Sequence, residues 1–93
     1  MRYPIAIEPG DNQHTFGVVV PDLPGCFSAG DSLDEAMAQA RVAILLHLEV
    51  MFNEGKAPTL PSPVGMHAGN PDFKGWIWAN VEIDPEDLSE TPS

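Results

Sequence analysis

The chain has 93 residues, which is enough for one small domain and too few for two. Its hydrophobic content of 43%, interrupted by 10 prolines and 8 glycines, excludes a disordered segment and an all-helical protein, so a mixed fold is expected. The formal net charge of −10, from 14 acidic residues against 4 lysines and arginines, argues against direct binding of nucleic acid. Such a negative charge favours a basic partner, and the alternative explanation is that it only keeps the protein soluble.

The cysteine count and the apolar runs indicate where the protein works. A single cysteine cannot form an internal disulfide, and the first ten residues lack the hydrophobic stretch of a signal peptide. The longest apolar run, residues 42–46, is too short to cross a bilayer. We therefore expect a cytoplasmic protein that does not insert into membranes.

Three strands are predicted in the first thirty residues. Apolar and other residues alternate over residues 3–7, and Pro4 marks this strand as an edge or a strand start. Proline, glycine, aspartate and asparagine then predict a turn, and the β-branched residues of 15–20 predict the second strand of a hairpin. A short third strand is expected at 26–29.

A long helix is predicted from Leu33 to Glu54. Ser32 and Glu35 have the spacing of a capping box, and Gly55 offers the left-handed stop that helices commonly use. One apolar stripe on this helix can cover a sheet, and it consists of Leu33, Met37, Ala40, Ile44, Leu48 and Met51.

Further apolar residues lie outside that stripe, at Val42, Leu45, Leu46 and Phe52. Either the following loop folds back over them or they form a subunit interface. We expect at least a dimer, with Val42, Leu45 and Leu46 in the contact.

Residues 56–75 carry four prolines and three glycines and predict a long loop, either a cover or a crossover back to the sheet. In the last strand, Ile77, Ala79, Val81 and Ile83 are expected to face the core. Trp76 and Trp78 then face the opposite side, which has no second layer in the predicted fold. The prediction is an α+β domain over residues 1–84. It has a mainly antiparallel sheet of three or four strands, with one long helix on one face and the order β-β-β-α-β. Residues 85–93 are expected to be an acidic tail or the start of a linker.

Several stretches together resemble the N-terminal domain of HicB-type antitoxins. They are YPIAIEP before a turn, FGVVVPDLPGCFSAGDSLDEAMAQAR, and a long helix that ends in a glycine and is followed by P-x-L-P. The likeness runs from Tyr3 to about Ile83, and its signature turn consists of Pro21, Asp22, Leu23, Pro24, Gly25 and Cys26.

The resemblance implies a partial ribonuclease-H-like fold that binds and inhibits a small, basic HicA-type toxin, itself a ribonuclease acting on mRNA. Antitoxins of this type commonly carry a C-terminal DNA-binding segment as well. Because this sequence stops at Ser93, we expect DNA binding only if such a segment exists beyond it. No cofactor is expected.

Enzymatic alternatives have weaker support in the residues. Cys26 has no histidine nearby in the sequence to activate it and is explained more simply as core filling. A metal-dependent nuclease needs several carboxylates, and the first strand offers Ile5 and Ile7 at its centre instead. The three histidines share no ligand spacing, so no metal site is predicted.

The expected function is therefore inhibition of a toxin by direct binding, without catalysis. The alternatives are a ribonuclease with a degenerate carboxylate site and a non-catalytic oligomerisation module. Tryptophan is enriched at binding hot spots, so the toxin is expected on the face that carries Trp76 and Trp78, with Glu8 and Asp22 close by. The other possibility is that the long loop packs over the two tryptophans.

Overall fold

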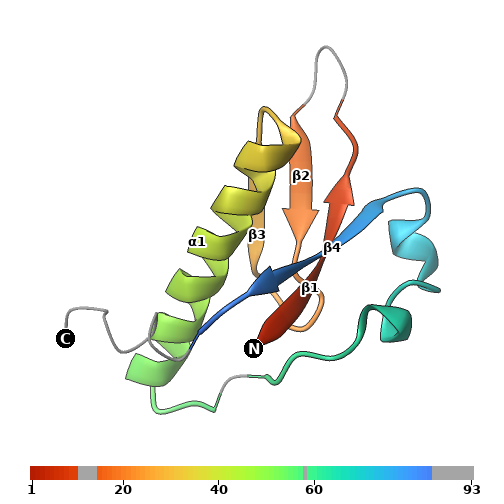
Figure 1. Ribbon diagram of the computed structural model, residues 1–93. Helices are drawn as coiled ribbons and strands as arrows, with labels where there is room; N and C mark the ends of the chain where they lie inside the picture. The colour runs from red at the N-terminus through yellow and green to blue at the C-terminus, as the bar shows by residue number, and fades with distance from the viewer. Residues whose placement is uncertain (11–14, 58, 85–93) are drawn as a thin grey trace.

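The computed structural model of the chain describes residues 1–10, 15–57 and 59–84. Four strands form one antiparallel sheet, and a single long helix packs on one of its faces (Figure 1). The strands are β1 (Arg2–Glu8), β2 (Phe16–Val19), β3 (Phe27–Gly30) and β4 (Ile77–Glu82), and the helix is α1 (Leu33–Asn53). The predicted α+β fold and its order β-β-β-α-β are confirmed. Residues 11–14 of the predicted turn and the predicted tail at 85–93 lie outside the described residues.

The strand order in the sheet is β3-β2-β1-β4, so β1 is a central strand. The prediction that Pro4 places β1 at an edge, or marks its start, is wrong. The ladder between β1 and β2 begins only at Ala6, whereas Pro4 is opposite Asn80 of β4. A proline is tolerated there because this part of β1 is paired on one side only.

The helix begins and ends as its sequence predicts. Ser32 is extended, and its side chain accepts a hydrogen bond from the amide of Glu35 at 3.1 Å. Past the last turn, Gly55 takes a φ of 74°, the left-handed conformation that stops a helix at low cost.

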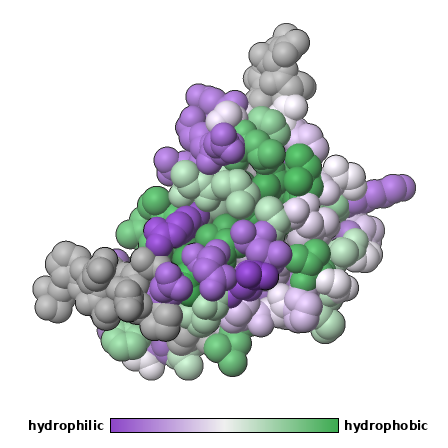
Figure 2. Space-filling view, viewed as in Figure 1, coloured by the Kyte–Doolittle hydropathy of each residue, from purple (hydrophilic) through white to green (hydrophobic). Residues whose placement is uncertain are grey.

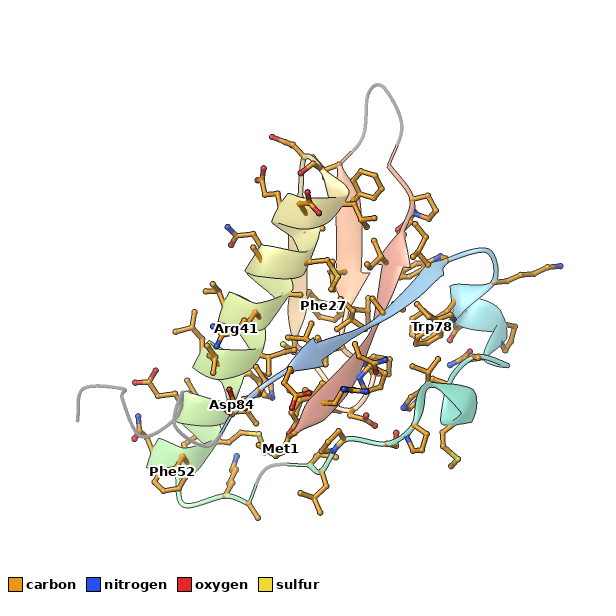
Figure 3. The ribbon with its side chains drawn as sticks, viewed as in Figure 1. Met1, Phe27, Arg41, Phe52, Trp78 and Asp84 are labelled. Atoms are coloured by element: carbon orange, nitrogen blue, oxygen red, sulfur yellow. The ribbon has the colours of Figure 1, made fainter. Side chains whose placement is uncertain are left out.

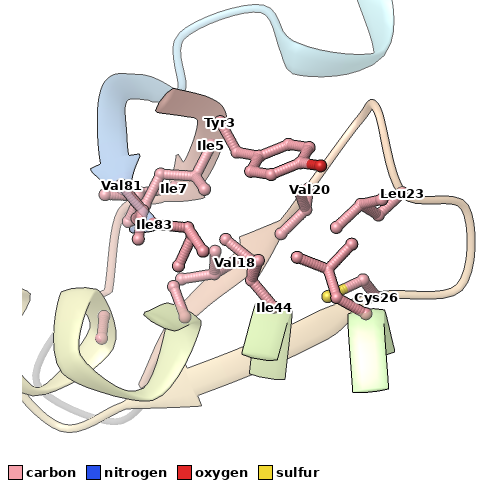
Figure 4. Close-up of a cluster of buried hydrophobic side chains, with 13 residues drawn as sticks. Tyr3, Ile5, Ile7, Val18, Val20, Leu23, Cys26, Ile44, Val81 and Ile83 are labelled. Atoms are coloured by element: carbon pink, nitrogen blue, oxygen red, sulfur yellow. The ribbon is translucent and has the colours of Figure 1, made fainter. Parts of the chain in front are cut away.

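The core lies between α1 and the sheet (Figure 4). From β1 it takes Tyr3, Ile5 and Ile7, and their alternation turns Pro4, Ala6 and Glu8 to the other side of the sheet, here called the outer face. The other buried apolar members of the core are Val18, Val20, Leu23, Cys26, Ala36, Ala40, Ile44, Leu48, Val81 and Ile83.

The buried stripe of α1 differs from the predicted one at its start. Ala36, Ala40, Ile44 and Leu48 are buried, whereas Leu33 is exposed. The reason is a close approach: a Cβ atom on Gly30 would come within 2.7 Å of the Cα of Ala36, so the backbones of β3 and α1 touch at this point. Val42 and Leu46 are exposed, and hydrophobic patches alternate with hydrophilic ones on this side of the molecule (Figure 2).

Residues 59–75, here called the strap, connect the end of α1 to β4 and contain two short 3₁₀ turns, η1 (Val64–Met66) and η2 (Pro71–Phe73). The strap does not fold back over the exposed residues of α1. It runs past the sheet to the start of β4 (Figure 1), and the rings of its His67 and Phe73 contact Trp78. The outer face therefore has a partial second layer, which agrees with the alternative that the long loop packs over the two tryptophans.

Candidate functional site

The signature turn joins β2 to β3 through a compact set of backbone hydrogen bonds. The amide of Leu23 donates to Val20, the amide of Cys26 donates to Leu23, and the amide of Val20 donates to Cys26, at 3.0, 3.0 and 3.2 Å. Gly25 supplies the positive φ of 86° that the turn needs. The turn buries Leu23 and Cys26 in the core and directs Asp22 toward the strap.

Asp22 is buried, with 9% of its surface exposed, and it binds residues of the strap. Ser62 donates its amide to Oδ2 at 2.8 Å and its hydroxyl to Oδ1 at 2.7 Å, and Nε2 of His67 lies 3.0 Å from Oδ1. Burial alone would raise the pKa of the Asp22 carboxyl, but the hydrogen bonds from Ser62 and the contact with His67 outweigh it, so this pKa lies below its ordinary value.

Aspartate, serine and histidine together also occur in hydrolases, but this arrangement does not form a catalytic relay. In a relay, one imidazole nitrogen takes the serine proton while the other is held by the carboxylate. Here the same nitrogen, Nε2 of His67, faces both the Ser62 hydroxyl at 2.8 Å and Asp22, and that hydroxyl donates to Asp22. The cluster therefore fastens the strap and does not activate a nucleophile.

An aromatic cluster continues from this network along the outer face. The ring of His67 stacks on Trp78 with centroids 6.4 Å apart and planes at 17°. Phe73 meets Trp78 and Trp76 edge to face, at 5.5 and 5.2 Å. Both tryptophans are half-buried, so part of each ring remains accessible.

The register of the sheet places four residues in one row across the outer face. Phe27 is opposite Val19, Val19 is opposite Ala6, and Ala6 is opposite Trp78. Trp78 and Phe27 thus lie on the two edge strands, as Figure 3 shows for the labelled side chains. The strap packs on the Trp78 end of the row, whereas Phe27 is exposed.

The four predicted toxin-binding residues divide into two groups. Trp76 directly precedes β4, whose Ile77 is opposite Ile7, so Trp76 lies near the end of β1 where Glu8 is exposed. Trp78 and Asp22 are connected through His67, but the Asp22 carboxylate is bound within the molecule. Ile77 lies on the helix side of the sheet, opposite the buried Ile7, but it is less covered than predicted, since 38% of its surface is exposed.

The predicted oligomer residues divide as well. Leu45 packs against the core, whereas Val42 and Leu46 are exposed. Leu46 lines a groove between α1 and β3 of about 310 Å³, together with Gly25, Cys26, Phe27, Ala43, His47 and Val50. Burial raises the pKa of the Cys26 thiol, which fits a packing role.

Sequence reasoning missed Phe27, Ser62 and His67. Alternation within the short third strand could have placed Phe27 on the outer face, opposite to Cys26. No sequence signal pairs Ser62 and His67 with Asp22, because they lie 40 and 45 positions away along the chain.

The part of the chain that the structure describes contains neither a candidate metal site nor a candidate membrane-spanning helix. No group of three histidine, cysteine, aspartate or glutamate side chains there could hold a metal ion. None of the described helices is long and apolar enough to span a bilayer.

Comparison with known proteins gives a consistent result. A family model described as "HicB_like antitoxin of bacterial toxin-antitoxin system" matches residues 3–93. A 14.9 kDa protein encoded in the rep-hol intergenic region of Haemophilus phage HP1 is 40% identical over 84 residues. That alignment covers 90% of this chain and 62% of the phage protein, so the chain spans less than two thirds of that relative's length.

Two solved structures are similar in fold and in sequence. The crystal structure of the Burkholderia pseudomallei antitoxin HicB superposes with a TM-score of 0.88 at 34% identity, covering all of this chain and 70% of that one. A chain in the HicA3 and HicB3 toxin-antitoxin complex superposes with a TM-score of 0.77 at 35% identity, covering 91% of this chain and 100% of that one.

Proposed function

The chain belongs to the HicB-like antitoxin family, and from this premise we propose that it neutralises a small, basic HicA-type toxin by binding it. The observation that carries the proposal is the likeness to a chain of the HicA3 and HicB3 complex, which this domain matches over that chain's full length. The net charge of −10 supports it, since a protein that cleaves RNA needs a basic surface and an acidic partner is attracted to that surface.

We propose that the toxin docks on the outer face of the sheet. This face combines partly accessible aromatic rings, at Trp76 and Trp78, with an exposed carboxylate at Glu8. Aromatic residues more often carry affinity, whereas exposed charges mainly accelerate the encounter. Asp22 contributes indirectly, because it holds the strap whose His67 packs on Trp78.

The proposed mode of action is steric and does not involve catalysis by this chain. The family is described as one of antitoxins, and the Asp22, Ser62 and His67 side chains are arranged to hold the strap against the signature turn. We also place the protein in the cytoplasm, where mRNA is the target and where a lone buried thiol stays reduced.

Co-purification tests the proposal. The chain is expressed together with a HicA-type toxin taken from the reading frame adjacent to its gene, with the affinity tag on the toxin only. We expect both proteins to elute as one complex in gel filtration. Separate elution of two folded proteins at micromolar concentration would contradict the proposal.

A further inference from the structure

The position of the strap does not depend on a buried anchor of its own. The structure describes the strap in full, and none of its residues is buried. At its start, the hydroxyl of Tyr3 donates to the carbonyl of Thr59 at 2.9 Å. Farther along, Ser62 and His67 contact the buried Asp22. A segment attached through such contacts opens more easily than the core, so each contact helps to decide where the strap lies.

The hydrogen-bond geometry at His67 places a proton on its Nε2 atom. Nε2 lies 2.8 Å from the hydroxyl oxygen of Ser62 and 3.0 Å from Oδ1 of Asp22, and the hydroxyl donates its single hydrogen to that same Oδ1 at 2.7 Å. Without a proton, Nε2 and Oδ1 would be two acceptors in contact. With a proton, Nε2 donates toward both oxygens, so all three contacts are hydrogen bonds.

Burial and charge strengthen this network. The side chains of Asp22 and His67 are 8% and 21% exposed, so water competes little for their hydrogen bonds. Burial raises the pKa of the Asp22 carboxyl, but the hydrogen bonds from Ser62 and the contact with His67 bring this pKa below its ordinary value. The carboxylate is therefore an ionised acceptor at neutral pH, and it fixes both the position of the imidazole ring and the location of its proton.

The fixed imidazole ring restricts the indole ring of Trp78. The two rings stack with their planes at 17°, and Phe73 meets the same indole edge to face, at 86° and 5.5 Å between centroids. Trp78 thus lies beside the strap (Figure 3) and keeps part of its surface accessible. One stacked ring and one edge-on ring, both from the strap, hold the indole in a single orientation on the outer face.

We propose that His67 is a positioning residue for toxin binding. Through the proton on Nε2 it is held by Asp22 and Ser62, and through the face of its ring it keeps Trp78 in the orientation that the toxin contacts. Ordering a side chain before the complex forms reduces the entropy that binding costs. The inference rests on the proposed docking of the toxin on the outer face, and it requires no contact between the toxin and the network itself.

A double-mutant cycle with the HicA-type toxin tests the proposal. Ser62→Ala removes the hydroxyl that holds Nε2 of His67 and leaves Trp78 intact, so we expect about three- to tenfold weaker binding in calorimetry. In the Trp78→Ala background the same change should have no effect, because the ring that it positions is gone. Tyr3→Phe is the matched control, since it also removes one hydrogen bond to the strap, and it should bind like the parent.

Two results of this cycle would overturn the inference while the toxin still binds the parent. One is an equal effect of Ser62→Ala with and without Trp78, and the other is equal affinity of the Ser62→Ala and Tyr3→Phe variants. Failure of the folded parent to bind would instead overturn the proposed docking, and this inference with it. The two failures are therefore distinguishable.

Nuclear magnetic resonance tests the positioning without the toxin. In protein labelled with nitrogen-15, the side-chain nitrogen shifts of His67 should show a proton on Nε2, with His67→Gln identifying the signals. The indole N–H of Trp78 should be well ordered in the parent and in Tyr3→Phe, and measurably less ordered in Ser62→Ala. A His67 ring without a proton on Nε2, or an indole of equal order in all three proteins, would overturn the proposal.

Discussion

Ser62 gives both its amide and its hydroxyl to the carboxylate of Asp22, at 2.8 and 2.7 Å, across 40 residues of sequence. Asp22→Asn keeps the shape of the side chain but replaces one acceptor oxygen with a donor. Removing a partner of a buried donor costs about 1–3 kcal/mol, and we expect a loss of that size in the free energy of unfolding. Urea denaturation measures it. Glu82→Gln, at an exposed carboxylate paired with Arg2, is the control and should cost less than about 1 kcal/mol.

The same carboxylate predicts a pH dependence. The pKa of Asp22 is lower in the folded protein than its ordinary value. The contribution of its carboxylate to the free energy of unfolding is therefore complete above the unfolded pKa of about 3.9, and it is lost as the pH falls through the lower pKa of the folded protein. The stability difference between the parent and Asp22→Asn should shrink as the pH falls below about pH 4. A difference that keeps its full size below that pH would show that Asp22 does not hold the strap in its charged form.

The close contact between β3 and α1 predicts that adding one methyl group at Gly30 strongly lowers the free energy of unfolding. Gly30→Ala would place a Cβ atom within 2.7 Å of Glu35 and Ala36 backbone atoms, and backbone cannot move aside as a flexible side chain can. We expect a loss of about 2 kcal/mol or more in unfolding free energy, typical of overpacking. Gly65→Ala is the matched control, because a Cβ there meets nothing within 4 Å, and it should change stability by about 0.5 kcal/mol at most. Equal stabilities of the two variants would show that α1 sits farther from β3.

Local sequence signals predicted the elements of the fold well. Alternation gave the strands, and the Ser32 cap with Gly55 gave the helix almost to the residue, because these signals act over a few neighbouring positions. Alternation placed Ile77 on the helix side of the sheet, but the residue is only partly covered because it lies at the first position of an edge strand, where the core has ended. Local sequence signals predict the secondary structure and the orientation of a residue, whereas its position in the sheet determines whether the core buries it.

The candidate site was less predictable because it depends on distant contacts. Asp22 was expected to be an exposed charge that accelerates association with the toxin. It is buried instead, because Ser62 of the strap, 40 positions away in the sequence, packs against it and donates a hydrogen bond to its carboxylate. The two tryptophans were expected on the outer face, and the strap partly covers them there through His67 and Phe73. Prolines and glycines showed that residues 56–75 form a loop, but not where that loop would lie.

The aromatic cluster predicts the main determinant of toxin affinity. Trp78→Ala removes a ring that lies on the outer face between the strap and Ala6, and we expect it to weaken toxin binding by about 2 kcal/mol or more. Calorimetry on folded samples measures the affinity. Ile77→Ala, at the neighbouring residue on the opposite side of β4, should bind within about 0.5 kcal/mol of the parent. If Ile77→Ala is the weaker binder, the toxin docks on the other side of this strand.

Glu8 predicts a kinetic effect. Its carboxylate is exposed at the end of β1, so Glu8→Gln should slow association with a basic toxin and reduce the dependence of the association rate on salt. The dissociation rate should change little. Stopped-flow or surface-binding kinetics at several salt concentrations measures both rates, with Glu49→Gln on α1 as the control. A larger effect of Glu49→Gln on association would place the toxin near the helix.

Inhibition of RNA cleavage tests the central claim most directly. The HicA-type toxin is incubated with mRNA alone, with this chain, and with the Trp78→Ala variant, while a fourth reaction holds this chain and mRNA without toxin. We predict that the chain alone cleaves nothing, that it stops cleavage by the toxin near stoichiometric concentration, and that Trp78→Ala requires a higher concentration for the same inhibition. Undiminished cleavage by the toxin in the presence of excess folded chain, or RNA degradation by the purified chain itself, would contradict the account.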